Sequence, residues 1–241
     1  MGTQSTTKDG LETMMQANHL GHFLLMKLML EKGMLKTTGD DTTLSNEPSR
    51  VCILTSSTYL FAASSTGFDF VDPYCSTGQR EYTLFGQYSM TKLANMLISR
   101  ELARRYNTGG ASQTETALAV FAVHPGIVRT NVTSNMTWFY RLGNDMFAWI
   151  VAAIQKTPAE GAYSTVFTVS APLAQIPFWK KGSFVVNCQE QLANDYVEGP
   201  SGSLDSTRLW EWSEKQLSLA EGAMNGNNSS SRTDAGEKKE Q

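Results

Sequence analysis

The sequence predicts an α/β protein in which a mainly parallel β-sheet is covered by helices on both faces. Two short runs dominated by apolar residues, at 50–55 and 117–123, have the composition of strands that are buried on both faces. Long segments with apolar residues at helical spacing alternate with these runs along the chain. Such alternation is typical of parallel sheets, and it places functional side chains at the carboxyl ends of the strands.

The first half of the chain supplies two long helices and one strand. Apolar residues recur at helical spacing over 11–35, and a polar loop follows at 37–49. The strand at 50–55 runs into a Ser and Thr segment, which opens it into a loop. A stretch containing Gly, Asp and Pro at 67–83 predicts an irregular connection, and a second helix is predicted over 82–106.

The second half begins with the strand at 117–123, which His124-Pro125-Gly126 stops sharply because Pro and Gly favour a turn. Thr157 followed by Pro158 indicates the start of a helix, with Thr as the N-cap and Pro in the first turn. We expect this helix to end near Ser170.

The C-terminal part of the sequence divides into an ordered segment and a polar tail. A last short strand is predicted at 182–186 and a helix over 206–219. Residues 220–241 are rich in Asn, Ser, Gly, Lys and Glu, and such a segment buries too little apolar surface to fold. We therefore expect a partial domain over 1–219 and a disordered polar tail over 220–241.

Composition and charge exclude several classes of function. The net charge is −3 and no block of Lys and Arg occurs, which argues against a nucleic-acid partner. Three cysteines, Cys52, Cys75 and Cys188, are an odd number without Cys-x-x-Cys spacing, which argues against a disulfide framework or a zinc site. His19 and His22 lie three residues apart as metal ligands can, yet no carboxylate or thiol lies nearby in the sequence. We expect no metal.

Tyr88 and Lys92 are the first pair of residues whose spacing is compatible with a catalytic function. Four residues apart in a predicted helix, their side chains reach the same side of that helix. Spacing alone also fits a Tyr and a Lys on the solvated face of an amphipathic helix. Neighbouring motifs must therefore decide between the two interpretations.

Four motifs occur in order along the chain, and each falls on a predicted helix or at the end of a predicted strand. They are Asn18-His-Leu-Gly-His-Phe23, Thr55-Ser56-Ser57, Tyr88-Ser-Met-Thr-Lys92 and His124-Pro-Gly-Ile-Val-Arg-Thr130. With Thr91-Lys-Leu-Ala-Asn95 and Lys156-Thr-Pro-Ala-Glu-Gly-Ala162, the sequence resembles the short-chain dehydrogenase/reductases, and within them the group of retinol dehydrogenases and WW-domain oxidoreductases. The resemblance extends from about Lys8 to Leu217. It implies the C-terminal part of a Rossmann-type doubly wound parallel sheet.

The resemblance implies an oxidoreductase that transfers a hydride between NADP(H) or NAD(H) and an apolar alcohol or carbonyl compound of the retinoid, steroid or lipid type. Tyr88 would be the acid/base, and a free Tyr with a pKa of about 10 is poorly matched to that task near neutral pH. We expect the charge of Lys92 to favour the phenolate. Ser56 would hydrogen-bond the substrate oxygen, with Ser57 as the alternative, and Asn18 would close a proton relay to Lys92.

The resemblance also implies where the cofactor binds. Lys92 would hydrogen-bond the nicotinamide ribose next to Tyr88. The turn after the strand at 117–123 would contact the nicotinamide carboxamide through Pro125, Gly126, Val128 and Thr130. The group resemblance favours NADP(H) over NAD(H). An aromatic segment resembles the lid over the substrate pocket and would admit an apolar substrate; ordinary core or a membrane-contacting surface is the alternative, and its residues are Trp138, Phe139, Tyr140, Phe147 and Trp149.

A Gly-rich turn for the cofactor phosphates does not occur before the first predicted helix. The resemblance therefore predicts the catalytic half of the domain, whose first strand would have a bare apolar edge. A truncated, inactive product that acts as an interaction or subunit-completing protein is the alternative function. The expected partners are an apolar small molecule, with peripheral membrane contact and an oligomer or sheet-completing partner left open. The expected location is intracellular, either cytoplasmic or associated with the endoplasmic reticulum.

Overall fold

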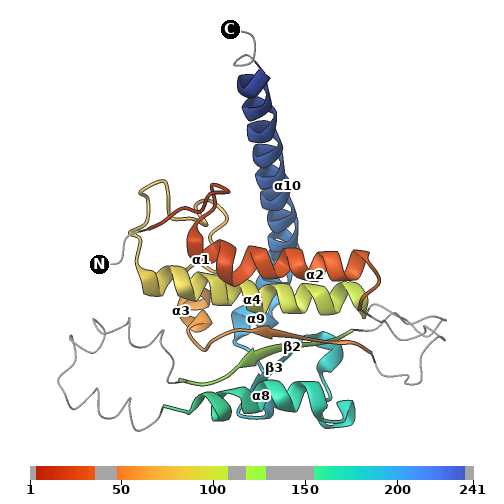
Figure 1. Ribbon diagram of the computed structural model, residues 1–241. Coiled ribbons are helices and arrows are strands. Elements are labelled where there is room, and N and C mark those ends of the chain that lie inside the picture. The colour runs from red at the N-terminus through yellow and green to blue at the C-terminus, as the bar shows by residue number, and fades with distance from the viewer. Residues whose placement is uncertain (1–3, 36–47, 108–117, 129–154, 237–241) are drawn as a thin grey trace.

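The computed structural model describes residues 4–35, 48–107, 118–128 and 155–236, with side chains as far as 220. A sheet forms the middle layer, with α2, α4 and α10 on one face and α8 on the other (Figure 1). The principal elements, in chain order, are α1 (Thr13–Met15), η1 (Gln16–Leu20), α2 (Gly21–Glu31), β1 (Arg50–Leu54), α3 (Tyr59–Ser65), α4 (Leu84–Tyr106), β2 (Ala119–His124), α8 (Pro158–Ser170), β3 (Ser183–Val186), β4 (Gln189–Gln191), α9 (Asp195–Glu198) and α10 (Pro200–Gly236). This architecture is the mixed α/β fold that the sequence predicts.

The sheet has the strand order β1-β2-β3-β4. Val51 pairs with Val120 and Ala122 pairs with Phe184, both in parallel ladders, so the three predicted strands are confirmed. The short β4 was not predicted, and it pairs antiparallel with β3. Within the described residues β1 has a ladder on one side alone, so its other edge is bare.

The first predicted helix is divided into three parts. Glu12 caps α1 by accepting hydrogen bonds from the backbone amides of Met14 and Met15. A π-helical turn, η1, then precedes α2. A π-turn holds more residues than an α-turn, and hydrophobic periodicity over a long window averages across it. The sequence therefore predicts a helix here without revealing the widened turn.

Helices α4 and α8 agree with the predicted elements. Thr83 caps α4 through a hydrogen bond from the Gly86 amide. At α8, Thr157 and Glu160 form a reciprocal capping box, and Pro158 stands in the first turn as expected. Leu93 and Leu97 of α4 are fully buried. The catalytic candidates on α4 therefore project from a helix that is fixed by the core.

Helix α10 differs from the prediction at both ends. It begins at Pro200, earlier than the expected 206, because Pro fits the first turn of a helix. It continues to Gly236 through most of the expected disordered tail, and Figure 1 shows this end projecting from the body. Adding residues to an existing helix avoids the cost of nucleation, which allows a helix to extend over a segment of weak propensity. Residues 237–241 lie outside the described part.

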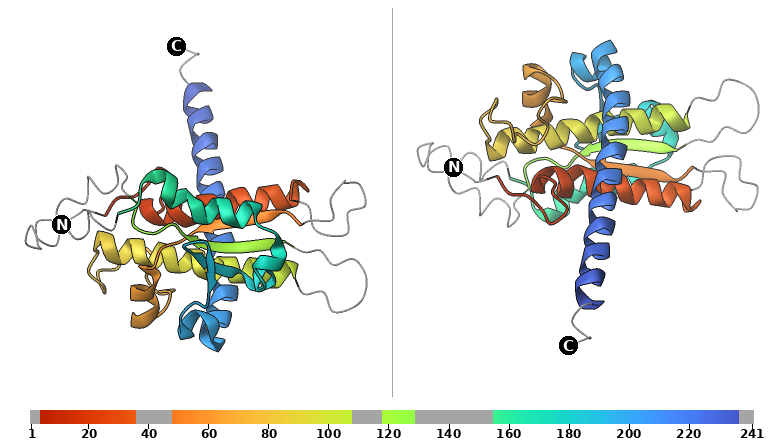
Figure 2. Two further views of the ribbon diagram at one scale, coloured as in Figure 1. Left: turned by 90° about the horizontal axis from the view of Figure 1, so that it is seen from below. Right: turned by 90° about the horizontal axis from the view of Figure 1, so that it is seen from above.

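Helix α10 also contacts the two other long helices of its layer, α2 and α4. Both views in Figure 2 show it crossing α2 and α4 at a steep angle. Glu214 of α10 accepts a 2.7 Å hydrogen bond from Lys27 of α2, and Thr207 lies 3.3 Å from the buried carboxylate of Glu101 on α4. On the opposite face, Arg50 of β1 donates to the Thr168 carbonyl of α8 at 2.9 Å.

Candidate active site

The site begins where two parallel strands end side by side. The Thr55 amide donates to the Val123 carbonyl at 2.9 Å, which keeps the chain in register just beyond β1. Ser56 follows at this edge, and Pro125 and Gly126 follow the end of β2. Parallel strands therefore bring the two predicted loop motifs to the same edge of the sheet.

Tyr88, Ser56 and Lys92 meet at this edge. The Ser56 side chain lies near the Tyr88 hydroxyl and lowers its pKa. The ammonium of Lys92 lies 5.3 Å from the centroid of the Tyr88 ring and donates to the Leu54 carbonyl at 3.2 Å. Ser57, the alternative serine, is exposed. Of the two serines, Ser56 is thus the one in contact with Tyr88.

Burial determines the protonation of this pair. It raises the pKa of Tyr88, and the Ser56 side chain opposes the rise. Burial also lowers the pKa of Lys92. The expectation that Lys92 favours the Tyr88 phenolate stays a prediction, and in this structure the ammonium donates to the Leu54 carbonyl. Both groups are shifted toward their neutral forms.

Asn18 lies in the π-helical turn, close to α4. Its side-chain amide donates to the Thr91 hydroxyl at 3.2 Å, next to Lys92 in the chain. Its backbone carbonyl accepts a 3.1 Å hydrogen bond from Asn95. The Thr55 hydroxyl donates to the Lys92 carbonyl at 2.9 Å, so the strand end is joined to the same turn of α4. π-Turns occur frequently at functional sites, and this one brings Asn18 to the Lys92 turn.

The turn after β2 holds the cofactor candidates. Gly126 has a φ of +90°, and a Cβ there would lie 3.0 Å from atoms of the Lys156 side chain. Val128 forms a parallel bridge with Lys156, whose ammonium lies 3.4 Å from the Pro125 carbonyl. Thr130, the remaining candidate, lies outside the described residues. Contact of this turn with Lys156, just before α8, was not predicted from the sequence.

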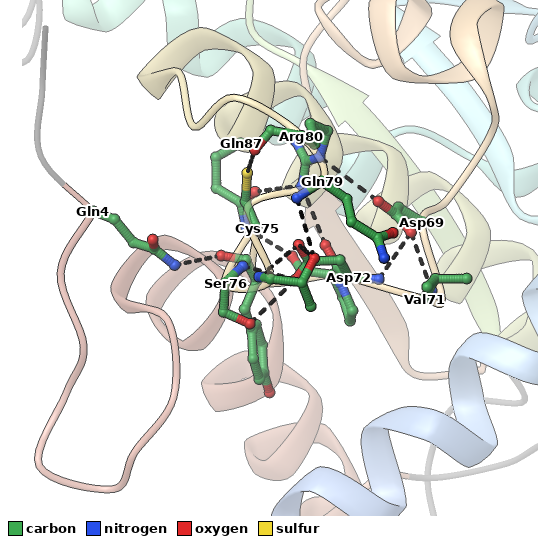
Figure 3. A network of polar contacts seen from close by, with 12 residues as sticks. Gln4, Asp69, Val71, Asp72, Cys75, Ser76, Gln79, Arg80 and Gln87 are labelled. Atoms are coloured by element: carbon green, nitrogen blue, oxygen red, sulfur yellow. Dashed lines mark hydrogen bonds and ion pairs between the residues drawn. The ribbon is translucent and has the colours of Figure 1, made fainter.

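A second polar feature, also missed, fixes the loop that leads into α4 (Figure 3). Gln87, the residue before Tyr88, donates to Glu12 at 3.0 Å and to the Pro73 carbonyl at 2.9 Å, and it accepts from Arg80 at 3.2 Å. Asp72 accepts hydrogen bonds from the amides and hydroxyls of the two residues at 76–77. The signal in the sequence was an isolated Asp in a Gly-containing connection, which is typical of many loops.

An apolar cleft of about 430 Å³ lies between α2 and β1. Its walls include Met26, Met29 and Ile53, and Asn18 and Lys92 also line it. The aromatic segment predicted to cover the substrate lies outside the described residues. Among the residues that are described, no group of three or more His, Cys, Asp and Glu side chains is arranged to hold a metal.

Comparison with known proteins identifies retinol dehydrogenases and an oxidoreductase as relatives. No family model matches. Retinol dehydrogenase 14 from Homo sapiens is 32% identical over 213 residues, which cover 88% of this chain and 54% of that protein. WW domain-containing oxidoreductase from Homo sapiens is 28% identical over 223 residues, covering 92% and 47%. Retinol dehydrogenase 11 from Mus musculus is 32% identical over 221 residues, covering 89% and 57%.

The solved structures support the fold. An uncharacterized protein from Mycobacterium paratuberculosis superposes with a TM-score of 0.55 at 23% identity, over 91% of this chain and 63% of that one. The chain spans about half the length of the curated relatives it matches. Fold, motif order and relatives agree: the chain belongs to the short-chain dehydrogenase/reductase family, in the group of the retinol dehydrogenases and WW domain-containing oxidoreductase.

Proposed function

We propose that this chain carries the catalytic residues of an oxidoreductase that uses NADP(H) or NAD(H) to interconvert an apolar alcohol and its carbonyl compound. The observation that carries this proposal is the contact of Tyr88 with Ser56 at the sheet edge, with Lys92 one helical turn away. The names of relatives support it, since they include dehydrogenases of retinol and polyprenol.

In the proposed reaction a bound nicotinamide cofactor would supply the hydride for the carbonyl carbon, or would accept one in the reverse direction. Tyr88 donates its phenolic proton to the carbonyl oxygen as the carbon is reduced, and takes it back in the oxidation. Ser56 hydrogen-bonds the same oxygen and keeps it within reach of Tyr88. Lys92 and Asn18 return the proton to Tyr88 from solvent.

The described residues fit the nicotinamide end of such a cofactor. Lys92 and Tyr88 would hold the ribose, and the turn with Pro125, Gly126 and Val128 would hold the carboxamide; the φ of +90° at Gly126 favours glycine in this turn. We extend the turn to Thr130 by resemblance. The sequence contains no Gly-rich phosphate turn, so the proposal for this chain concerns the nicotinamide end. NADP(H) is favoured over NAD(H) on the same resemblance.

We propose an apolar substrate of the retinoid, steroid or lipid type. The apolar cleft reaching Asn18 and Lys92 supports this choice, because an apolar lining favours apolar ligands. No helix in the described part of the chain is long and apolar enough to traverse a bilayer. A peripheral contact with the endoplasmic reticulum membrane, where an apolar substrate would partition, remains part of the proposal.

The test compares Tyr88→Phe with Tyr82→Phe in retinal reduction with NADPH. Both variants lose one phenolic hydroxyl, and Tyr82 donates to Glu12 at 3.1 Å in the loop before α4. Loss of the acid/base lowers kcat by about 10²- to 10⁴-fold in Tyr88→Phe. The Tyr82→Phe rate stays within a few-fold of the unaltered chain. Equal rates for Tyr88→Phe and the unaltered chain would exclude the proposed mechanism.

The bare edge of β1 favours a second candidate function, a non-catalytic interaction protein. An edge strand beside an apolar cleft can accept a strand from a second chain. In this case the purified chain neither binds NADPH nor reduces retinal, and it elutes as an oligomer in size-exclusion chromatography. A catalytically active monomer would exclude this candidate.

A further inference from the structure

Asn95 lies on α4, one helical turn after Lys92, and is buried at the centre of the site. Its Nδ2 donates to the Asn18 carbonyl at 3.1 Å and to the Leu54 carbonyl at 2.9 Å. Lys92 donates to the same Leu54 carbonyl at 3.2 Å. One side-chain amide thus joins the π-helical turn, the end of β1 and the Lys92 turn of α4.

The Asn95 side chain also borders His19. Both hydrogens of its amide are taken by the two carbonyls. The Nε2 atom of His19 lies 2.8 Å from the Ser213 hydroxyl on α10. The ring stacks on Phe23 and Trp212, with centroids 6.0 and 6.5 Å away. His19 therefore joins the π-helical turn to the C-terminal helix.

The hydrogen bonds of Ser213 determine which ring nitrogen of His19 carries the proton. The ring is fully buried, and its pKa is lowered to about 4, so it is neutral near pH 7 and has one N–H. The Ser213 hydroxyl donates its single hydrogen to the Leu209 carbonyl at 2.8 Å, so Nε2 of His19 carries the ring hydrogen and donates it to the Ser213 oxygen. These bonds hold the π-helical turn against α10.

We propose that Asn95 is a positioning residue for hydride transfer. The inference rests on the proposed function. Its physical basis is that the three segments joined by the amide each carry a candidate catalytic residue: Asn18, Ser56 just after Leu54, and Lys92. Asn95 touches none of the reacting atoms itself.

The expected effect of replacing Asn95 follows from the Leu54 carbonyl, which accepts from both Asn95 and Lys92. Without the Asn95 donor, the Leu54 carbonyl retains Lys92 as its remaining side-chain donor, and the Asn18 carbonyl retains His22 at 3.3 Å. The π-turn and the strand end are then free to move apart. Misplacement of catalytic groups by about 1 Å costs on the order of 100-fold in rate. Asn95 also lines the apolar cleft, but the apolar side chains that would contact the substrate are kept, so we expect the loss to fall mainly on kcat.

The experiment uses Asn95→Asp and Asn95→Ala, with Ser99→Ala as the control. Asp keeps the size of Asn95 but lacks the two amide donors. Ala removes the donors without introducing a buried carboxylate, and it tests the proposal if Asn95→Asp does not fold. Ser99 is buried one turn further along α4 and donates to the Met96 carbonyl at 2.7 Å, away from the three segments.

We expect kcat for retinal reduction to fall by about 10- to 100-fold in both Asn95 variants, with KM within about twofold, and to be unchanged in Ser99→Ala. Folded Asn95 variants with unaltered kcat would overturn the positioning role while Tyr88→Phe still supports the proposed function. An unaltered chain that transfers no hydride would overturn both.

Discussion

Acidification should unfold this protein partly through His19. The ring is fully buried between two aromatic side chains, and burial is the main cause that lowers its pKa from 6.5 to about 4. In the unfolded chain the same ring titrates normally. Between pH 6.5 and 4 the unfolded state therefore binds more protons than the folded state, so stability falls as the pH falls through this window.

The magnitude follows from the separation of the two pKa values. A difference of one pH unit corresponds to about 1.4 kcal/mol at full protonation of the unfolded state. Lowering the pH from 7 to 5 traverses most of the window. His19 alone should therefore reduce the free energy of unfolding by about 2 kcal/mol over this interval, and by about 3 kcal/mol near pH 4.

Urea unfolding at pH 7 and at pH 5 measures this effect. The comparison is between the unaltered chain, His19→Gln, which cannot titrate, and His22→Gln, which removes an exposed histidine from the next helical turn. The carboxylates titrate alike in all three, so the difference in slope with pH isolates His19. His19→Gln should lose about 2 kcal/mol less than the other two proteins. The same loss in all three would refute the assignment of a buried neutral ring.

Two further predictions concern stability. Asp72→Asn should lower the free energy of unfolding by about 2–3 kcal/mol in urea titration, because an amide group replaces an oxygen that accepts two hydrogen bonds from residues 76–77; an unchanged midpoint would contradict the role of this loop. Gly161→Ala should lower Tm although Ala favours helix by about 1 kcal/mol, because its Cβ would collide with the Val128 side chain. A raised Tm would show that the Val128 side chain moves aside at little cost in free energy.

The features of the fold that were predictable from sequence are those with local causes. The strand predicted at 50–55 and the N-cap at Thr157 depend on neighbouring residues, and both are found in the structure. β4 was missed because its polar residues, Gln189–Gln191, lack an apolar pattern and pair through the backbone. The π-turn was missed because one widened turn leaves the hydrophobic period of its helix almost unchanged.

The contacts of the candidate site can likewise be separated into those that follow from the sequence and those that depend on tertiary packing. Tyr88 and Lys92 are one turn apart on a single helix, so their proximity follows from spacing. The contact between Tyr88 and Ser56 follows from strand order, once the resemblance supplies the topology. The contacts of Asn95 join residues that are 77 and 41 positions away along the chain. Periodicity and spacing carry no information about such pairs, because they depend on how the layers pack.

Burial also affects the protonation of the Tyr88–Lys92 pair. It raises the pKa of Tyr88 and lowers that of Lys92, which favours the neutral form of each group. Lys92 donates to the Leu54 carbonyl at the end of β1, and Asn95 donates to the same carbonyl. The packing of α4 against β1 therefore makes two polar side chains, one helical turn apart, share a single acceptor.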